Sequence, residues 1–413
     1  MHPHAKPADP ELTRIILNEI DAFYEHSTMN TEYNIETVFI STAIILFFVT
    51  FSSLFRTKIE SAEVAHEYKF INGLRGLAAV FVFINHAPFA LTNLGINNSA
   101  FSSWGQIYPN LGSFGVQIFF CITGFLFFDK IIKSKNMDWN VFFISRLKRV
   151  APLYYFSMLI DLIVAILFSS QPILTKETIV TIAGLISFNF IDNPMKIGDT
   201  SLISLSSVTW TLVHEWRFYA VLPLVAISYN SKYRVAVLLA AIIIAAIDLG
   251  NSALVCWTYF LSGIVAAVIF RLESMSKGFK FIGAVTAAVI FILTCGLLEI
   301  PGYGYLRFTL TSVFFFCVTI SNPKILHYQF LNRLSGISYS IYLLHLPVLF
   351  IIFKTSSLFL DLSTISKYTF WSINLMAILA IVAISTITFV NIEKRFMQKT
   401  KDSIRNINTL QKI

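Results

Sequence analysis

Long apolar runs separated by short polar joints recur along the chain from residue 37 to residue 391. Each run is about 17 to 25 residues long, the length that an α-helix needs to cross about 30 Å of hydrocarbon. The pattern therefore predicts an all-α fold, a polytopic transmembrane helical bundle of about 11 spans. The predicted spans are 37–55, 70–91, 112–129, 150–170, 208–228, 233–249, 252–270, 281–298, 304–320, 333–352 and 368–391.

The same pattern divides the chain into four parts. A polar N-terminal segment at 1–36 and one extra transmembrane span at 37–55 precede the main membrane domain at 70–392, and a basic tail follows at 393–413. The apolar run at 178–192 is too short for a full span, and we expect a re-entrant or interfacial piece there.

Composition and charge agree with a membrane protein. The chain has 413 residues, of which 56% are hydrophobic and 13% charged, and a soluble core of this size does not need so much apolar surface. The net charge of +8 comes from basic residues in the joints and the tail, which is a topology signal rather than a nucleic-acid surface. The partner is a lipid bilayer, with the N-terminus outside and the C-terminus in the cytoplasm.

The four cysteines lie inside apolar runs without a CxxC or histidine-spaced pattern. We expect them to be packed thiols and predict no metal site.

Two ionisable residues share the run at 70–91. Ten residues separate Arg75 from His86, so in a helix both side chains lie on one face, with their Cα atoms about 16 Å apart. Charged groups within a span are costly and often functional. Taken alone, however, Arg75 can reach the lipid headgroups and His86 can bond to a neighbouring helix.

Four further segments place polar residues in or beside apolar runs. The small residues at both ends of the first of them, Gly115 and Gly124, allow close approach of neighbouring helices. The segments are GVQIFFCITG at 115–124, RLKRVAPLYY at 146–155, WTLVHEWRFY at 210–219 and SYSIYLLHLP at 338–347.

In content and in order, these segments together with Arg75 to His86 resemble the membrane acyltransferase-3 family. The resemblance runs from about Phe70 to Arg395 and implies a ten-helix acyltransferase core, which the extra span precedes. Arg75 and His86 match the family's Arg-x10-His motif.

The other motifs match residue by residue. Arg146 and Arg149 match the family's Arg-x-x-Arg motif, and Glu215 matches the glutamate of its Trp-Ser/Thr-Leu…Glu…Phe-Tyr segment. His345 falls in its Tyr-x-x-His-x-Pro segment. Members of the family move an acyl group, often acetyl from acetyl-CoA, to hydroxyls of surface or secreted carbohydrates, and their usual setting is the bacterial inner membrane.

The resemblance and the residue chemistry together suggest roles. His86 is the expected general base for the acceptor hydroxyl, or a nucleophile that holds the acyl group. Glu215 either orients this imidazole as a second catalytic residue or pairs with Arg217 or His214.

Five residues are assigned to substrate and donor binding. Arginines on the cytoplasmic side suit the phosphates of acyl-CoA, although a plain positive-inside cluster explains Arg146 and Arg149 equally well. His345 is also compatible with helix packing. The five residues are Arg75, Arg146, Arg149, Tyr154 and His345.

Other functions stay open at this point. Ionisable residues in a bundle also mark the path of a transporter for a glycan or small anion, but no repeated halves are visible. An acyltransferase that acts on a lipid or a protein is the closer alternative. The tail is too short for the hydrolase-like domain fused to some relatives, so we expect the membrane part, or a separate partner protein, to complete the transfer.

Overall fold

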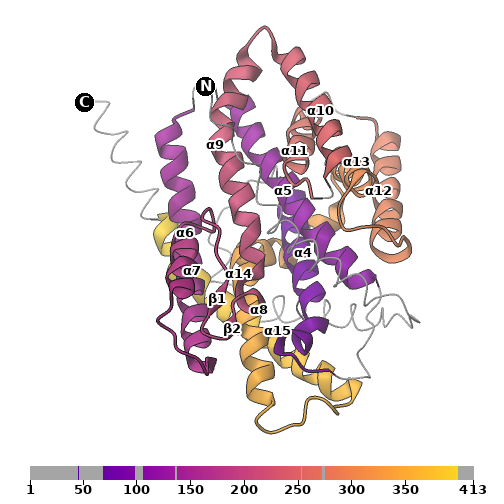
Figure 1. Ribbon diagram of the computed structural model, residues 1–413. Helices are drawn as coiled ribbons and strands as arrows, with labels where there is room; N and C mark the ends of the chain where they lie inside the picture. Colours follow the sequence, from indigo (N-terminus) through magenta and orange to yellow (C-terminus); the bar gives the residue numbers. More distant parts are fainter. Residues whose placement is uncertain are drawn as a thin grey trace.

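The computed structural model describes Ile45 and residues 68–97, 106–134, 137–252, 254–271 and 275–398. The predicted N-terminal segment, the rest of the extra span at 37–55 and the tail beyond residue 398 lie outside the described residues. The described part is a bundle of α-helices (Figure 1), which confirms the all-α fold.

In Figure 1, α6 and α7 lie at one side of the bundle and α12 and α13 at the other, with α4, α5, α9 and α14 between them. The helices are α4 (Lys69–His86), α5 (Ile107–Lys133), α6 (Trp139–Phe168), α7 (Lys176–Ile186), α8 (Ile203–Ser206), α9 (Trp210–Asn230), α10 (Arg234–Asn251), α11 (Trp257–Phe270), α12 (Lys277–Ile292), α13 (Tyr305–Ser321), α14 (Gln329–Ser356) and α15 (Lys367–Thr388).

Shorter elements join or extend these helices. A two-stranded antiparallel hairpin lies between α7 and α8. The short elements are the 3-10 segments η2 (Pro88–Ala90), η3 (Thr92–Leu94), η5 (Ser207–Thr209) and η7 (Lys324–His327), the π-helical segments η6 (Leu293–Leu297) and η8 (Phe389–Glu393), and the strands β1 (Lys196–Ile197) and β2 (Thr200–Ser201).

The helices support a multi-pass membrane protein. Within the described residues, 6 helices are long and apolar enough to cross a membrane, or 7 if the bent pair Lys69–His86 and Pro88–Leu94 forms one span. Helices α11 and α13 are shorter apolar helices. Every predicted span from residue 70 onward falls on a helix, but the count of eleven spans is not confirmed.

Helix α6 differs from its predicted span in a way that matters for the site. The sequence suggested a loop up to residue 149, whereas the helix begins at Trp139. Asp138 caps it, because its side chain accepts a hydrogen bond from the Val141 backbone N–H at 3.0 Å. The loop expectation is therefore wrong for Arg146 and Arg149, which lie on a helix with fixed directions.

The short apolar run after α6 forms helix α7, which has 11 residues. That is about half the length of a membrane-crossing helix. A full span at this point was rejected from the sequence, and the length of α7 agrees with that prediction.

Glycines bring the central helices close together. Helix α4 packs against α5 and α14, and α5 packs against α11. A Cβ added at Gly124 would lie 2.2 Å from the Phe260 carbonyl oxygen, and one added at Gly115 would lie 2.8 Å from that of Ala78. The close approach predicted from the small residues at both ends of this segment is confirmed.

The crossing of α5 and α11 predicts one stability effect. A Cβ at Gly263 would lie 2.1 Å from the Cys121 carbonyl oxygen, which belongs to the backbone and cannot move aside easily. We expect Gly263→Ala to cost about 1 to 3 kcal/mol of stability through overpacking, measured as a lower melting temperature in detergent. Gly278→Ala is the matched control, because nothing lies within 4 Å of its added Cβ. Equal melting temperatures for both variants would contradict this packing.

Candidate active site

His86 is the last residue of α4, at a break in the span. The chain bends by 40° between α4 and the segment Pro88–Leu94, and Pro88 has no backbone N–H to continue the helical hydrogen bonds. Both short segments after the break pack against α14. Non-helical backbone at membrane depth is tolerated where protein covers it or where it lines a cavity, so the half-buried His86 imidazole occupies a place typical of a functional site.

His345 of α14 lies directly against His86, with ring centroids 5.1 Å apart. It is fully buried, and its Nδ1 lies 3.0 Å from the Ile341 carbonyl oxygen. A carbonyl only accepts hydrogen bonds, so Nδ1 carries the proton and the neutral ring keeps a lone pair on Nε2. This Nε2 has no hydrogen-bond partner among the described residues. We call His86 and His345 the histidine pair.

The bundle also accommodates Pro347, two residues after His345. Proline lacks the N–H that would otherwise bond to the Leu343 carbonyl. Ser157 of α6 donates its hydroxyl to that carbonyl at 3.2 Å, so the freed acceptor is satisfied inside the protein. The contact fixes α6 beside the part of α14 that carries His345.

Arg75 lies on α4 three turns before His86, about 16 Å away along the helix axis. It is half-buried and interacts electrostatically with Arg149, Glu215 and Arg146. Arg149 and Arg146 repel this guanidinium, whereas Glu215 attracts it. The described residues thus hold three arginines near one glutamate in a low-dielectric bundle, an excess of positive charge that a further anion would offset.

Aromatic rings hold the two arginines of α6. The Arg146 guanidinium lies over the Phe127 ring at 5.1 Å, and the Arg149 guanidinium lies over the Tyr339 ring at 5.7 Å. Such cation–π contacts orient a guanidinium without neutralising its charge. The ring contacts therefore leave the charge of both arginines in place, and Arg149 pairs through Nη1 with the carboxylate of Glu393.

Glu215 lies among these arginines. It accepts a hydrogen bond from Tyr219 and interacts electrostatically with Arg146, Arg75 and Arg149. We call Arg75, Arg146, Arg149 and Glu215 the arginine cluster. Neither pairing suggested from the sequence is observed for Glu215: Arg217 is exposed, and the His214 ring packs on the rings of Trp210 and Phe120. The ring centroids lie 5.6 Å and 6.3 Å apart, respectively.

Tyr342 lies between the arginine cluster and the histidine pair. It interacts electrostatically with Glu215, and its ring centroid is 6.3 Å from that of His345. Its hydroxyl is 2.8 Å from the Thr211 hydroxyl. The structure brings His86 together with His345 and Glu215 together with the arginines, so the orientation of His86 by Glu215 stays a prediction.

Tyr154, which the sequence assigned to donor binding, packs between α6 and the end of α7. It is 1% exposed, its hydroxyl donates to the Leu185 carbonyl at 2.7 Å, and its ring stacks on Phe188. These contacts describe a structural residue that holds α7 against α6. Its role in donor binding stays a prediction.

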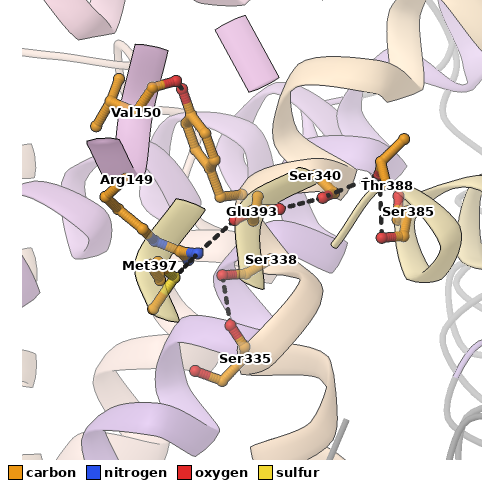
Figure 2. Close-up of polar contacts among 10 residues, drawn as sticks. Arg149, Val150, Ser335, Ser338, Ser340, Ser385, Thr388, Glu393 and Met397 are labelled. Carbon is orange, nitrogen blue, oxygen red and sulfur yellow. Dashed lines mark hydrogen bonds and ion pairs between the residues drawn. The ribbon is translucent and has the colours of Figure 1, made fainter. Parts of the chain in front are cut away.

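Glu393 was not recognised from the sequence as part of a site. Two basic residues follow it, so it was counted with the tail, but it is fully buried at the end of η8. Figure 2 shows its carboxylate between Arg149 and Ser340, and both side chains donate hydrogen bonds to it. The sequence signal that could have identified it is the apolar residues on both sides of the short charged stretch, Ile392 before it and Phe396 and Met397 after it.

Comparisons with known proteins identify the family. Searches of curated proteins and of solved structures match nothing. A scan against protein-family models matches residues 68–390 to the acyltransferase-3 model, described as an acyltransferase domain. The match covers most of the chain and contains Arg75, His86, the arginines of α6, Glu215 and His345. The chain therefore belongs to the acyltransferase-3 family of membrane acyltransferases.

Proposed function

We propose that this protein is an O-acetyltransferase of the bacterial inner membrane, which moves acetyl from cytoplasmic acetyl-CoA to a hydroxyl of a cell-surface polysaccharide or lipid-linked glycan. The observation that carries the proposal is the pairing of two centres along α4. The arginine cluster lies at one end, and the histidine pair lies about 16 Å away along the axis.

The arginine cluster suits the phosphates of coenzyme A. Guanidinium groups bind phosphate oxygens through paired, charge-assisted hydrogen bonds. Because Arg75, Arg146 and Arg149 repel one another beside Glu215, a bound polyanion would stabilise the arginines. The pantetheine arm of coenzyme A is an extended chain of the same order of length as the separation of the two centres. Phosphates bound at the cluster would therefore place the thioester near His86.

The histidine pair supplies the proton chemistry. In the simplest route His86 takes the proton of the acceptor hydroxyl, whose oxygen attacks the thioester carbonyl carbon. The C–S bond then breaks, and the coenzyme A thiolate receives the proton from the imidazolium. His345 lies where it can stabilise the imidazolium of His86, because its Nε2 keeps a lone pair.

The acceptor is expected from the other side of the membrane, over the segment between α6 and α9. This segment contains α7, the β-hairpin and α8, and α8 packs against α14. Ser204 donates a hydrogen bond to the Asn93 carbonyl at 3.1 Å, which fixes the segment beside the break that follows His86. A glycan resting on it would reach the histidine pair without crossing the bundle.

The proposal is tested by reconstituting the protein in liposomes with labelled acetyl-CoA outside and glycan fractions of the source cell as acceptors. We expect label in a carbohydrate fraction in an alkali-labile ester. Label in the lipid or protein fraction instead would identify the other acceptor class and reject the carbohydrate.

A second measurement separates the two roles of His86. Without acceptor, a nucleophilic His86 forms an acetyl-imidazole and releases coenzyme A, so label stays on the protein. A general base leaves the protein unlabelled until the acceptor is added. The same incubation with His86→Ala shows whether any label depends on this residue.

A further inference from the structure

Glu393 is a buried carboxylate beside the arginine cluster that the proposed chemistry does not use. It lies in a π-helical turn, Phe389–Glu393, after which the helix continues to residue 398. A π-helical turn takes in one more residue than an α-helical turn and is frequent at functional sites. Asn391 of the same turn is exposed, whereas Phe389 and Glu393 are buried.

The carboxylate is held in place from two helices. Ser340 of α14 donates a hydrogen bond to Glu393, and Thr388 of α15 donates to the Ser340 hydroxyl at 3.2 Å (Figure 2). All three residues are buried. A carboxylate fixed in this way is costly to bury unless a cation faces it, and Arg149 is that cation.

Arg149 in turn lies over the Tyr339 ring, and its hydrogen bonds to Glu393 and Met397 both start from Nη1, which lies 3.1 Å from the Met397 sulfur. A guanidinium carries five N–H donors, so the pair with Glu393 leaves Arg149 with donors for a second anion. The pair also offsets part of the repulsion that Arg75 and Arg149 exert on each other.

We infer that Glu393 is a positioning residue, which holds the Arg149 guanidinium in the orientation that binds the phosphates of acetyl-CoA. This role rests on the proposed function, because it assumes that the arginine cluster binds the donor. It gives the last membrane helix, through its π-helical turn, a direct part in the donor site.

Glu393→Gln removes the charge of this side chain and keeps its shape. We expect the KM for acetyl-CoA to rise on the order of tenfold, while kcat changes less than threefold, since Glu393 does not touch the reacting atoms. Asn391→Ala, in the same turn but on the exposed face, is the matched control and keeps the wild-type KM. A KM for Glu393→Gln within twofold of wild type would overturn the role.

A double-mutant cycle tells positioning from a general effect on folding. If Glu393 acts through Arg149, Glu393→Gln changes the KM less than twofold in the Arg149→Ala background. If the double variant raises the KM by the product of the two single effects, the role of Glu393 is contradicted. Should Glu393→Gln not yield monodisperse protein, Ser340→Ala removes the anchor of the carboxylate and keeps both charges, and an unchanged KM in that variant overturns the role.

Failure of this role differs from failure of the proposed function. If the wild-type protein transfers no acetyl from acetyl-CoA to any fraction, the proposed function is wrong, and the role of Glu393 falls with it. If the wild type transfers acetyl and the KM of Glu393→Gln is unchanged, only the role of Glu393 is wrong.

Discussion

His86→Ala is expected to lower acetyl transfer by about 10²- to 10⁴-fold, because a positioned proton acceptor contributes that much to such reactions. The effect should fall on kcat, since the proposed binding site for the phosphates of the donor, the arginine cluster, lies three turns away. The measurement is transfer from labelled acetyl-CoA by equal amounts of inserted wild-type and variant protein.

His327→Ala is the matched control for this substitution. His327 is also half-buried, but it lies in η7, where its ring is hydrogen-bonded to Asn322 at 2.7 Å. We expect the His327→Ala variant to transfer acetyl at the wild-type rate. Equal transfer by wild type and His86→Ala, with both inserted, would show that His86 is not the catalyst.

Arg75→Ala has the second large effect. We expect the KM for acetyl-CoA to rise about 10- to 100-fold, the loss of one or two charge-assisted hydrogen bonds to phosphate. The melting temperature should not fall in parallel, because the substitution also removes the repulsion between Arg75 and Arg149. Arg75→Lys should recover only part of the affinity, since an ammonium cannot match the two-pronged geometry of a guanidinium.

Arg217→Ala serves as the control for Arg75. Arg217 lies two residues after Glu215 but is exposed, so its removal should leave the KM for acetyl-CoA unchanged. A KM for Arg75→Ala within twofold of wild type would remove Arg75 from the donor site. An equal rise in KM for Arg75→Ala and Arg217→Ala would indicate that surface charge attracts the anion non-specifically.

The sequence was sufficient to predict a helix at each apolar run from residue 70 onward and to place Arg75 and His86 on one face of the first of them. Apolar length predicts spans well because lipid imposes one geometry on the backbone, and the helical period then fixes which residues share a face. Close packing at Gly115 and Gly124 was also predictable, since small residues are the usual means of helix approach in membranes.

The partners of the site residues were harder to predict. The sequence left Glu215 either orienting His86 or pairing with Arg217 or His214. Contacts between distant helices decide its neighbours, and these place it with the arginines. His345 was assigned to substrate binding, and only the packing of α14 on α4 brings it against His86.

Glu393 was missed for a local reason. A carboxylate followed by basic residues is typical of a charged tail after a membrane helix. The apolar pattern of a single sequence does not reveal the π-helical turn that contains Glu393. The arginines of α6 were likewise counted with a loop, because the cap at Asp138 extends that helix beyond its apolar run. Helix ends are the least predictable feature of such a chain.

The most direct test of the central claim follows both halves of acetyl-CoA in sealed proteoliposomes that contain the protein. One label is carried on the acetyl group and another on the adenine, with a glycan acceptor inside. Acetyl transfer predicts that the acetyl label appears on the glycan while the adenine label stays outside as free coenzyme A, and that both events are lost in His86→Ala. Entry of both labels together would contradict an acetyltransferase and favour transport. Entry of neither label would also contradict the acetyltransferase.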